Sequence, residues 1–187
     1  MTRWFTSDLH FGHANIIGYC DRPFADVDAM DRALVARWNE TVAADDEVWV
    51  LGDVAMGRID ESLRLVAELA GTKRLVPGNH DRCWPGRADT AQSWAARYLA
   101  AGFAEILAEQ VDLTIGGRPA LACHFPYHGD SHDEARFHVH RPIDDGRLLL
   151  HGHVHTTWRV NGRQVNVGCD VWDYRPVSED EIVAALD

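Results

Sequence analysis

Seven residues with metal-binding side chains occur in short motifs spread along the chain. Aspartate and asparagine supply oxygen ligands and histidine supplies nitrogen, a mixture that suits Mn²⁺, Fe or Zn²⁺. A carboxylate can bridge two ions, and two ions roughly 3.5–4 Å apart can clamp the attacking and leaving oxygens of an in-line displacement. These residue types therefore predict a two-metal centre for phosphoester cleavage. The seven residues are Asp8 and His10 in Ser7-Asp8-Leu9-His10, Asp53 in Leu51-Gly52-Asp53, Asn79 in Gly78-Asn79-His80-Asp81, His124 in Cys123-His124-Phe125, and His153 and His155 in Gly152-His153-Val154-His155.

The motifs follow short apolar runs that are typical of buried strands. Strands are predicted at 4–6, 48–51 and 75–76 ahead of the first three motifs, and at 118–123 and 148–150 ahead of the last two. Ligands of α/β proteins usually gather at one rim of a sheet, beyond the carboxyl ends of its strands. We therefore expect the seven side chains to converge there.

Helices are predicted where apolar residues recur at three- and four-residue spacing. Gly71 follows one such stretch in the position that usually ends a helix. Ser178, with Glu181 three residues later, forms a capping box at the start of the last helix. The predicted helices cover residues 27–42, 59–70, 90–101 and 179–186.

The second half of the chain is rich in strands. Residues 106–115 and 118–123 are predicted to form a hairpin, and 158–160 to pair with 164–167 across Asn161-Gly162. A β-α-β-α-β first half followed by these strands favours an α/β fold in which two packed sheets have helices outside.

Composition limits the class of protein. A chain of 187 residues with 46% hydrophobic and 25% charged residues suits one globular domain over 1–187. No apolar run reaches the ~18 residues of a membrane span, no signal peptide is evident, and the four scattered cysteines indicate neither disulfides nor a zinc knuckle. A cytoplasmic setting is expected. The net charge of −11 argues against a broad surface for long nucleic acid, and the oligomeric state is left open.

The ordered motifs from Asp8 to His155 resemble those of the calcineurin-like metallophosphoesterase superfamily. The stretch Thr6-Ser7-Asp8-Leu9-His10-Phe11-Gly12-His13 and the compact length look like its small bacterial and phage members. The resemblance implies a four-layer α/β/β/α sandwich of two mixed sheets flanked by helices. Protein phosphatases of the superfamily carry Asp-Arg-Gly where this chain has Asp53-Val54-Ala55, so protein phosphatase activity is disfavoured.

The resemblance also implies a role for each motif residue. One metal would be held by Asp8, His10, Asp53 and His155, and a second by Asp53, Asn79, His124 and His153, with Asp53 as the bridge. Mn²⁺ is the favoured ion, with Fe, Zn²⁺, Ni²⁺ or Co²⁺ as alternatives. His80 would sit over the leaving group, and Asp81 would orient His80.

Substrate contacts are less well specified by the sequence. Five residues near the motifs are candidates, although each also suits a surface role: His13, Asn15, Arg22, Arg82 and His128. Arg87 is a similar case. The histidine- and arginine-rich segment 125–142 would either cover the site or form a solvated loop. His151 is interpreted as a packing residue.

The predicted activity is hydrolysis of a small phosphodiester or phosphomonoester, the diester being favoured, by attack of a metal-bridging hydroxide and with protonation of the leaving oxygen by His80. The substrate would be a small phosphoester, including a nucleotide. Two alternatives stay open: a nuclease acting on short or single-stranded nucleic acid, and a catalytically silent binding scaffold with the same fold.

Overall fold

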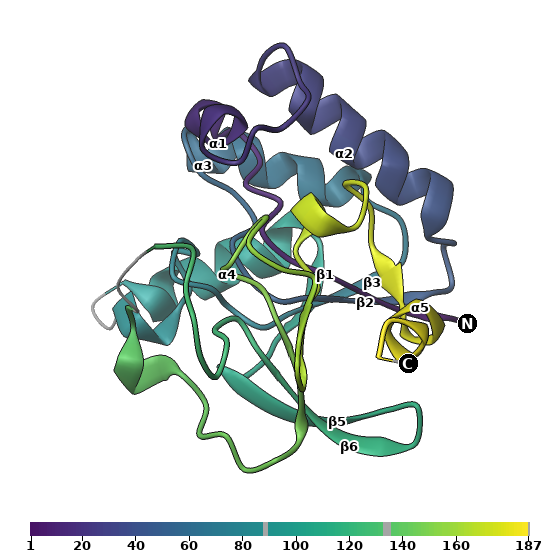
Figure 1. The fold of residues 1–187 in the computed structure, drawn as a ribbon. Helices are drawn as coiled ribbons and strands as arrows, with labels where there is room; N and C mark the ends of the chain where they lie inside the picture. Colours follow the sequence, from purple (N-terminus) through teal and green to yellow (C-terminus); the bar gives the residue numbers. More distant parts are fainter. Residues whose placement is uncertain (88–89, 133–135, 187) are drawn as a thin grey trace.

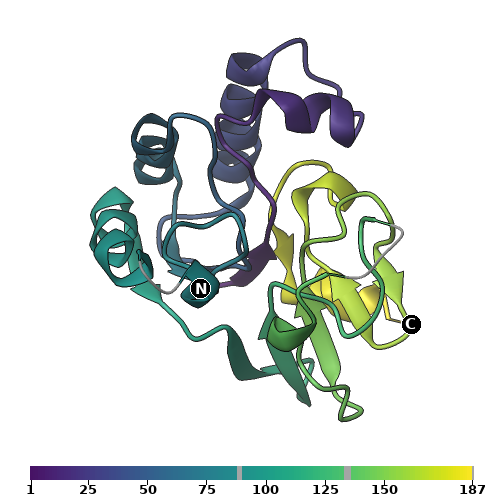
Figure 2. The ribbon, with the colours of Figure 1, turned by 90° about the vertical axis from the view of Figure 1, so that its left-hand side faces the viewer.

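Two five-stranded mixed sheets pack face to face in a computed structural model, which describes residues 1–87, 90–132 and 136–186. The first sheet has the strand order β10-β1-β2-β3-β4 and the second β5-β6-β7-β9-β8. The first half of the chain and most of the second half lie on opposite sides of the molecule (Figure 2). The predicted α/β sandwich of two mixed sheets is therefore confirmed.

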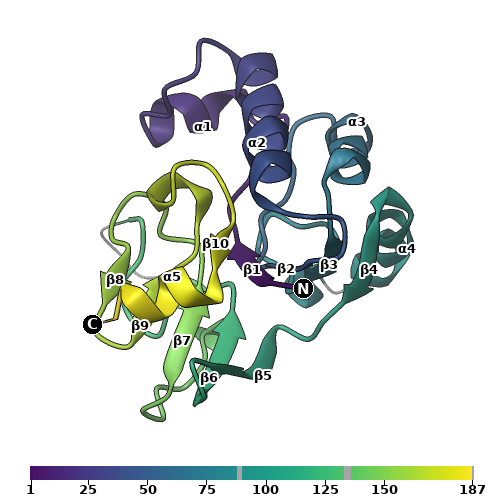
Figure 3. The same ribbon diagram turned by 90° about the vertical axis from the view of Figure 1, so that its right-hand side faces the viewer.

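The first sheet is built mainly from parallel strands connected through helices. β1, β2, β3 and β4 run parallel, and only β10 is antiparallel, against β1. Helices α2, α3 and α4 lie on the face of this sheet that points away from the second sheet (Figure 3). The elements are β1 (Arg3–Thr6), α1 (Ala14–Tyr19), α2 (Val27–Thr41), β2 (Glu47–Val50), α3 (Ile59–Ser62), a 3-10 helix (Leu63–Glu68), β3 (Thr72–Leu75), a 3-10 turn (Pro85–Arg87), α4 (Ala91–Ala101), β4 (Phe103–Ile106) and β10 (Val177–Ser178).

The second sheet combines two antiparallel hairpins with parallel pairing in its centre. β5 pairs with β6 and β8 with β9 antiparallel, whereas β6, β7 and β9 are parallel neighbours. The remaining elements are β5 (Gln110–Ile115), β6 (Arg118–Cys123), a 3-10 helix (His138–His140), β7 (Leu148–His151), β8 (Val160–Asn161), β9 (Gln164–Asn166), a 3-10 helix (Cys169–Val171) and α5 (Glu179–Ala184). α5 lies beside the N-terminal strand (Figure 1).

Apolar residues form three cores that follow the alternation of the strands. Val48 and Val50 point from β2 to the helices, where they join Trp38 of α2. Phe5 of β1 points the other way, into the space between the sheets. A third cluster lies on the outer face of the second sheet, where Trp84, Phe125, Tyr127 and partly buried Phe137 pack against Leu121, Cys123 and Leu149. There, the described part of segment 125–142 forms the outer layer, with one 3-10 helix.

The predicted elements agree with the structure except in detail. The stretch predicted as one strand at 106–115 is divided into β4 of the first sheet and β5 of the second, and the helix predicted at 59–70 is four α-helical residues followed by a 3-10 helix. The last hairpin turns at Gly162-Arg163, because Asn161 itself pairs with Gln164. The capping box of α5 is present.

Within the described residues, no helix is both long and apolar enough to cross a membrane.

Candidate metal centre

The strands deliver all seven predicted ligands to one place between the sheets. Each ligand motif begins within a few residues of the carboxyl end of β1, β2, β3, β6 or β7. Backbone hydrogen bonds hold the loops together: the Asp8 amide donates to the Gly52 carbonyl and the His10 amide to the Asp53 carbonyl, both at 3.0 Å. The His153 amide donates to Asp8 Oδ2 at 3.0 Å, which connects the two sheets. The seven side chains therefore converge because they follow the carboxyl ends of neighbouring strands, where ligands of α/β proteins usually bind.

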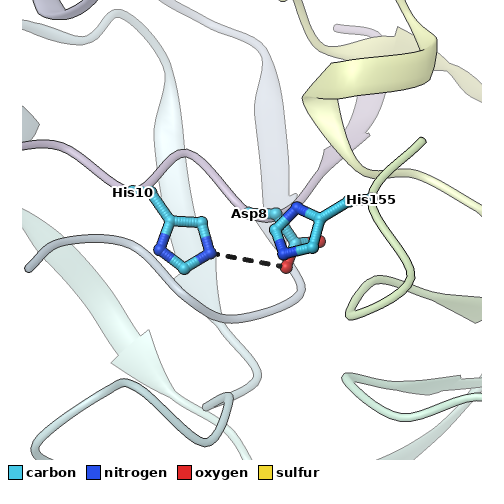
Figure 4. Close-up of side chains that lie close together, drawn as sticks. All are labelled: Asp8, His10 and His155. Carbon is cyan, nitrogen blue, oxygen red and sulfur yellow. Dashed lines mark ion pairs between the residues drawn. The ribbon is translucent and has the colours of Figure 1, made fainter. Parts of the chain in front are cut away.

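The ligand atoms form two overlapping groups. Side-chain ligand atoms of Asp8, His10 and His155 all lie within 4.8 Å of one another, and so do those of Asp8, Asp53 and His124. The first group is drawn in Figure 4, where Asp8 and His10 from one motif and His155 from a distant motif point toward one another. Asp53 Oδ2 lies between two histidines, 3.7 Å from His10 Nε2 and 3.5 Å from His124 Nε2. This position suits a bridging carboxylate, and Asp8 also belongs to both groups.

Five of the seven proposed ligands have a left-handed backbone, namely Asp8 (φ 56°), His10 (φ 53°), Asp53 (φ 56°), His153 (φ 71°) and His155 (φ 47°). This conformation is uncommon for residues with a side chain, and such strain costs of order 1–3 kcal/mol per residue. It persists only where the surroundings hold it in place, and it concentrates at functional sites. The left-handed backbone at these five residues therefore lowers the stability of the fold, and it orients their side chains toward the site.

Two motif glycines allow the loops to approach this closely. A Cβ on Gly78 would lie 2.8 Å from the Asp53 amide nitrogen and collide with Asp53 Oδ1. A Cβ on Gly152 would lie 2.5 Å from Asp8 Oδ2 and collide with the Ser7 hydroxyl. Both glycines are thus needed because the neighbouring carboxylates occupy the space of a side chain.

Hydrogen bonds fix which ring nitrogen each histidine offers. His124 Nδ1 lies 2.7 Å from the Leu51 carbonyl oxygen, which leaves Nε2 facing Asp53 and, at 3.2 Å, Asn79 Oδ1. His155 Nδ1 lies 3.0 Å from Asp170 Oδ2, so Nε2 is the ring nitrogen that His155 can offer to a metal ion. His153 has the opposite arrangement, because its Nε2 lies 3.3 Å from the Asp130 carboxylate.

The residues fit divalent cations. Both ring nitrogens of His10 are buried and have no hydrogen-bond partner among the described residues, and a buried polar group is normally satisfied. Burial, followed by the charge of His155, holds the pKa of His10 well below its usual value, so its ring is neutral and has a lone pair to give. Burial works against the charged form of Asp8, but neighbouring His155 and His124 outweigh it and lower its pKa. The oxygen and nitrogen donor set agrees with the predicted divalent ions.

Asp81 does not orient His80, and that expectation is wrong. Its buried carboxylate accepts hydrogen bonds from the amides of Asp53, Val54 and Gly78 at 2.8–3.1 Å. Burial and the nearby Asp53 charge raise the pKa of Asp81 to about 6. Asp81 therefore ties the Asp53 loop to the Gly78 loop and stabilises the backbone of the site.

His80 and His13 lie at the open side of the cluster. The His80 side chain is 39% exposed, and its Nε2 lies 4.0 Å from Asp53 Oδ2. Its amide donates to Asp53 Oδ1 at 2.8 Å, which fixes its position. Both histidines line a pocket of about 540 Å³ with Tyr19, Arg136 and Thr157. This volume admits a group larger than a phosphate.

Four other predicted substrate contacts do not reach this pocket. Arg22 is wrong as a phosphate contact, because it is buried in an ion pair with Asp170 and donates to the Leu9 and Asp8 carbonyls. The other three point elsewhere: Asn15 is exposed on α1, Arg82 lies over the Trp94 ring, and His128 is 74% exposed beside Asp144. Arg87 donates to the Asn79 carbonyl.

Two residues that contact proposed ligand histidines were missed at the sequence level. Asp170 and Asp130 are distant in sequence from His155 and His153, and no motif marks either residue. Segment 125–142 was suspected of contacting the site, and its described residues do so: Asp130 contacts His153, and Arg136 lines the pocket. His151 is buried as expected, with Nδ1 2.7 Å from the Gly152 carbonyl oxygen.

Comparison with known proteins agrees with this geometry. Residues 1–172 match the calcineurin-like phosphoesterase superfamily domain. The chain is 38% and 39% identical to the gene 66 proteins of Mycobacterium phages L5 and D29, covering 96% and 94% of this chain and 91% and 92% of those proteins. A crystal structure of a protein of unknown function from Aquifex aeolicus superposes with a TM-score of 0.74 at 26% identity, over 98% of both chains. The chain therefore belongs to the calcineurin-like phosphoesterase superfamily.

Proposed function

We propose that this metal-dependent phosphoesterase uses two divalent ions to hydrolyse a small phosphodiester. The observation that carries the two-metal proposal is the pair of unpartnered His10 ring nitrogens beside Asp8, Asp53 and His155. Asp53, between His10 and His124, is the bridging ligand. When bound, the two ions would neutralise charge on the phosphate oxygens and make a water molecule a better nucleophile. Mn²⁺ is our favoured ion.

His80 supplies the proton in this proposal. It is the histidine next to ligand Asn79, it lines the pocket, and its side chain is more exposed than those of the proposed ligands. The amide bond to Asp53 keeps its ring beside the site where the phosphate would bind. We therefore assign His80 as the general acid for the leaving oxygen.

The charge of the pocket favours a diester over a monoester. Arg22, Arg82 and Arg87 are all engaged away from the pocket. Among the described lining residues, the arginine is Arg136, and its side chain also donates to Asp130. A monoester dianion needs more cationic neutralisation than a diester monoanion. The 540 Å³ pocket offers room for a second ester substituent, which would include a nucleoside. The acidic net charge supports a small substrate over long nucleic acid.

A panel of substrates tests this proposal. Protein stripped with a chelator should lose hydrolysis of bis-nitrophenyl phosphate and of cyclic nucleotides, and should regain it best with Mn²⁺. The kcat/KM for bis-nitrophenyl phosphate should exceed that for nitrophenyl phosphate with the same ion. Asp53→Asn should abolish both activities, with Asp112→Asn, an exposed acid on β5, as control. Full activity in chelator would refute the metal requirement, and a tenfold preference for the monoester would refute the diester assignment.

We also propose a reducing, cytoplasmic setting. All four cysteines are buried and free of disulfides. A reducing compartment keeps such thiols in this form.

A further inference from the structure

We infer that Asp130 is a positioning residue that selectively supports one of the two metal ions, the one that His153 would bind. The inference rests on the proposed two-metal function, and it concerns a residue outside the seven ligands. His153 Nε2 lies 3.3 Å from the Asp130 carboxylate, and that side chain is fully buried. The geometry therefore connects a proposed ligand histidine to segment 125–142.

The contact decides the tautomer of His153. A carboxylate is an acceptor, so the Nε2–H of the neutral imidazole donates to Asp130 and the lone pair is on Nδ1. Such a carboxylate fixes the orientation of a ligating ring and raises its basicity. Asp130 therefore prepares the nitrogen that His153 offers to the ion.

Two arginines hold Asp130 in this position. Arg141, whose side chain is 6% exposed, donates to Asp130 Oδ2 at 2.7 Å and also to the Pro126 and Gly129 carbonyls. Arg136 donates to the same carboxylate through its backbone amide at 2.9 Å and through its side chain at 3.3 Å. A buried carboxylate with so many donors is rigid, and its orientation is set before an ion arrives.

The two ligand histidines of the last motif have separate supports. His155 relies on Asp170, which is paired with Arg22, whereas His153 relies on Asp130. The two acids come from different segments, and Asp130 makes no contact with His155 among the described hydrogen bonds and ion pairs. Removing Asp130 should therefore weaken one ion and spare the other.

Mn²⁺ titration followed by calorimetry tests the inference on the full chain. Wild type should bind two ions. In Asp130→Asn, one of the two dissociation constants should rise about 10–100-fold, the usual effect of losing such a support, while the other changes less than threefold. Asp144→Asn is the matched control, because Asp144 also pairs with an arginine but none of its described ion pairs involves a proposed metal ligand.

Each outcome has one meaning. Two unchanged dissociation constants in a folded Asp130→Asn protein would overturn the inference, and so would an equal loss at both sites. If wild type bound no metal ion, the proposed function itself would fail. Arg141→Met provides a second variant that keeps the carboxylate: it should weaken the same ion by a smaller factor, and circular dichroism should show the wild-type fold. An unchanged affinity in Arg141→Met together with a selective loss in Asp130→Asn would still support the role of Asp130.

Discussion

At the scale of single residues, the site separates groups that would bind metal from the group that would move a proton. The proposed ligands are nearly all buried, whereas His80 is partly exposed and lines the pocket. Most of the proposed ligand histidines also form a hydrogen bond from one ring nitrogen to a backbone carbonyl or a carboxylate. This bond leaves the other ring nitrogen to bind the metal ion. The chemistry of the site therefore depends on surroundings as much as on residue type.

Replacing His80 should separate catalysis from metal binding. In His80→Ala, kcat should fall roughly 10²–10⁴-fold, the range for loss of a general acid, with two ions still bound. The loss should be greater for an alkyl ester than for a nitrophenyl ester, because nitrophenolate leaves without a proton. Steady-state kinetics on both esters, together with the metal content, provide the measurement. Equal losses on the two esters would argue against proton donation.

At the scale of elements, buried and partly buried polar side chains connect loops that are distant in sequence. Arg22, after α1, reaches Asp170 in the 3-10 helix that follows β9. Asp31 of α2 accepts from the Gly12 amide in the loop between two site histidines. These contacts position the loops of the site from outside the ligand set.

Breaking the Arg22–Asp170 ion pair should destabilise the folded protein. Both side chains are fully buried, so Arg22→Met leaves the Asp170 carboxylate without its arginine and with only His155 as an ion-pair partner among the described residues. The free energy of unfolding should fall by about 3 kcal/mol, the lower end of the range for breaking a buried pair. Arg163→Met is the control, since its pair with Asp144 is largely exposed and should contribute at most about 1 kcal/mol. Denaturant unfolding of both variants gives the comparison, and similar losses would contradict the prediction.

Asp31 should make stability depend on pH. Burial raises the pKa of Asp31 from 3.8 to about 6 in the folded protein. The protonated form therefore favours the fold: the full stability is present below about 3.8 and is lost as the pH rises through about 6. Asp31→Asn should match wild type at pH 4 and be about 1–2 kcal/mol more stable at pH 7.5, a figure reduced for partial exposure.

Denaturant unfolding in chelator at both pH values measures this difference. Glu40→Gln, at an exposed acid near the other end of the same helix, controls for the general loss of negative charge on α2. A difference between Asp31→Asn and wild type that is the same at pH 4 and pH 7.5 would exclude the assignment.

At the scale of the whole molecule, the proposed metal centre joins the two sheets. Asp8, His10, Asp53 and Asn79 follow strands of the first sheet, and His124, His153 and His155 follow strands of the second. A ligand that binds only the folded state stabilises it. Mn²⁺ at 100 times its dissociation constant should therefore raise the free energy of unfolding by about 2.7 kcal/mol per ion. Thermal unfolding with and without Mn²⁺ measures this, and Asp53→Asn should remove most of the gain; an unchanged melting temperature would contradict it.

The sequence by itself determined the ligand motifs and the order of most elements, although α1 and β10 were not predicted. Apolar runs ending in Asp, Asn or His predicted where β1, β2, β3, β6 and β7 end, because strand periodicity and its termination are local properties. The capping box at Ser178 was equally local. The division of 106–115 between two sheets was not predictable, because both parts favour strand and only packing decides which sheet each joins.

Only the tertiary structure decided the supports of the site. The position of Arg22 close to the first ligand motif suggested a phosphate contact. In the structure Arg22 instead pairs with Asp170, which is 148 residues away in the sequence. Asp130 and Asp81 likewise acquire their roles from the groups that surround them in the fold. A charged side chain can bind a substrate, a ligand residue or another charge, and its burial and nearest partner decide which of these it does. Those two quantities are set by contacts between distant segments, so they follow from the packing of the two sheets and not from the local sequence.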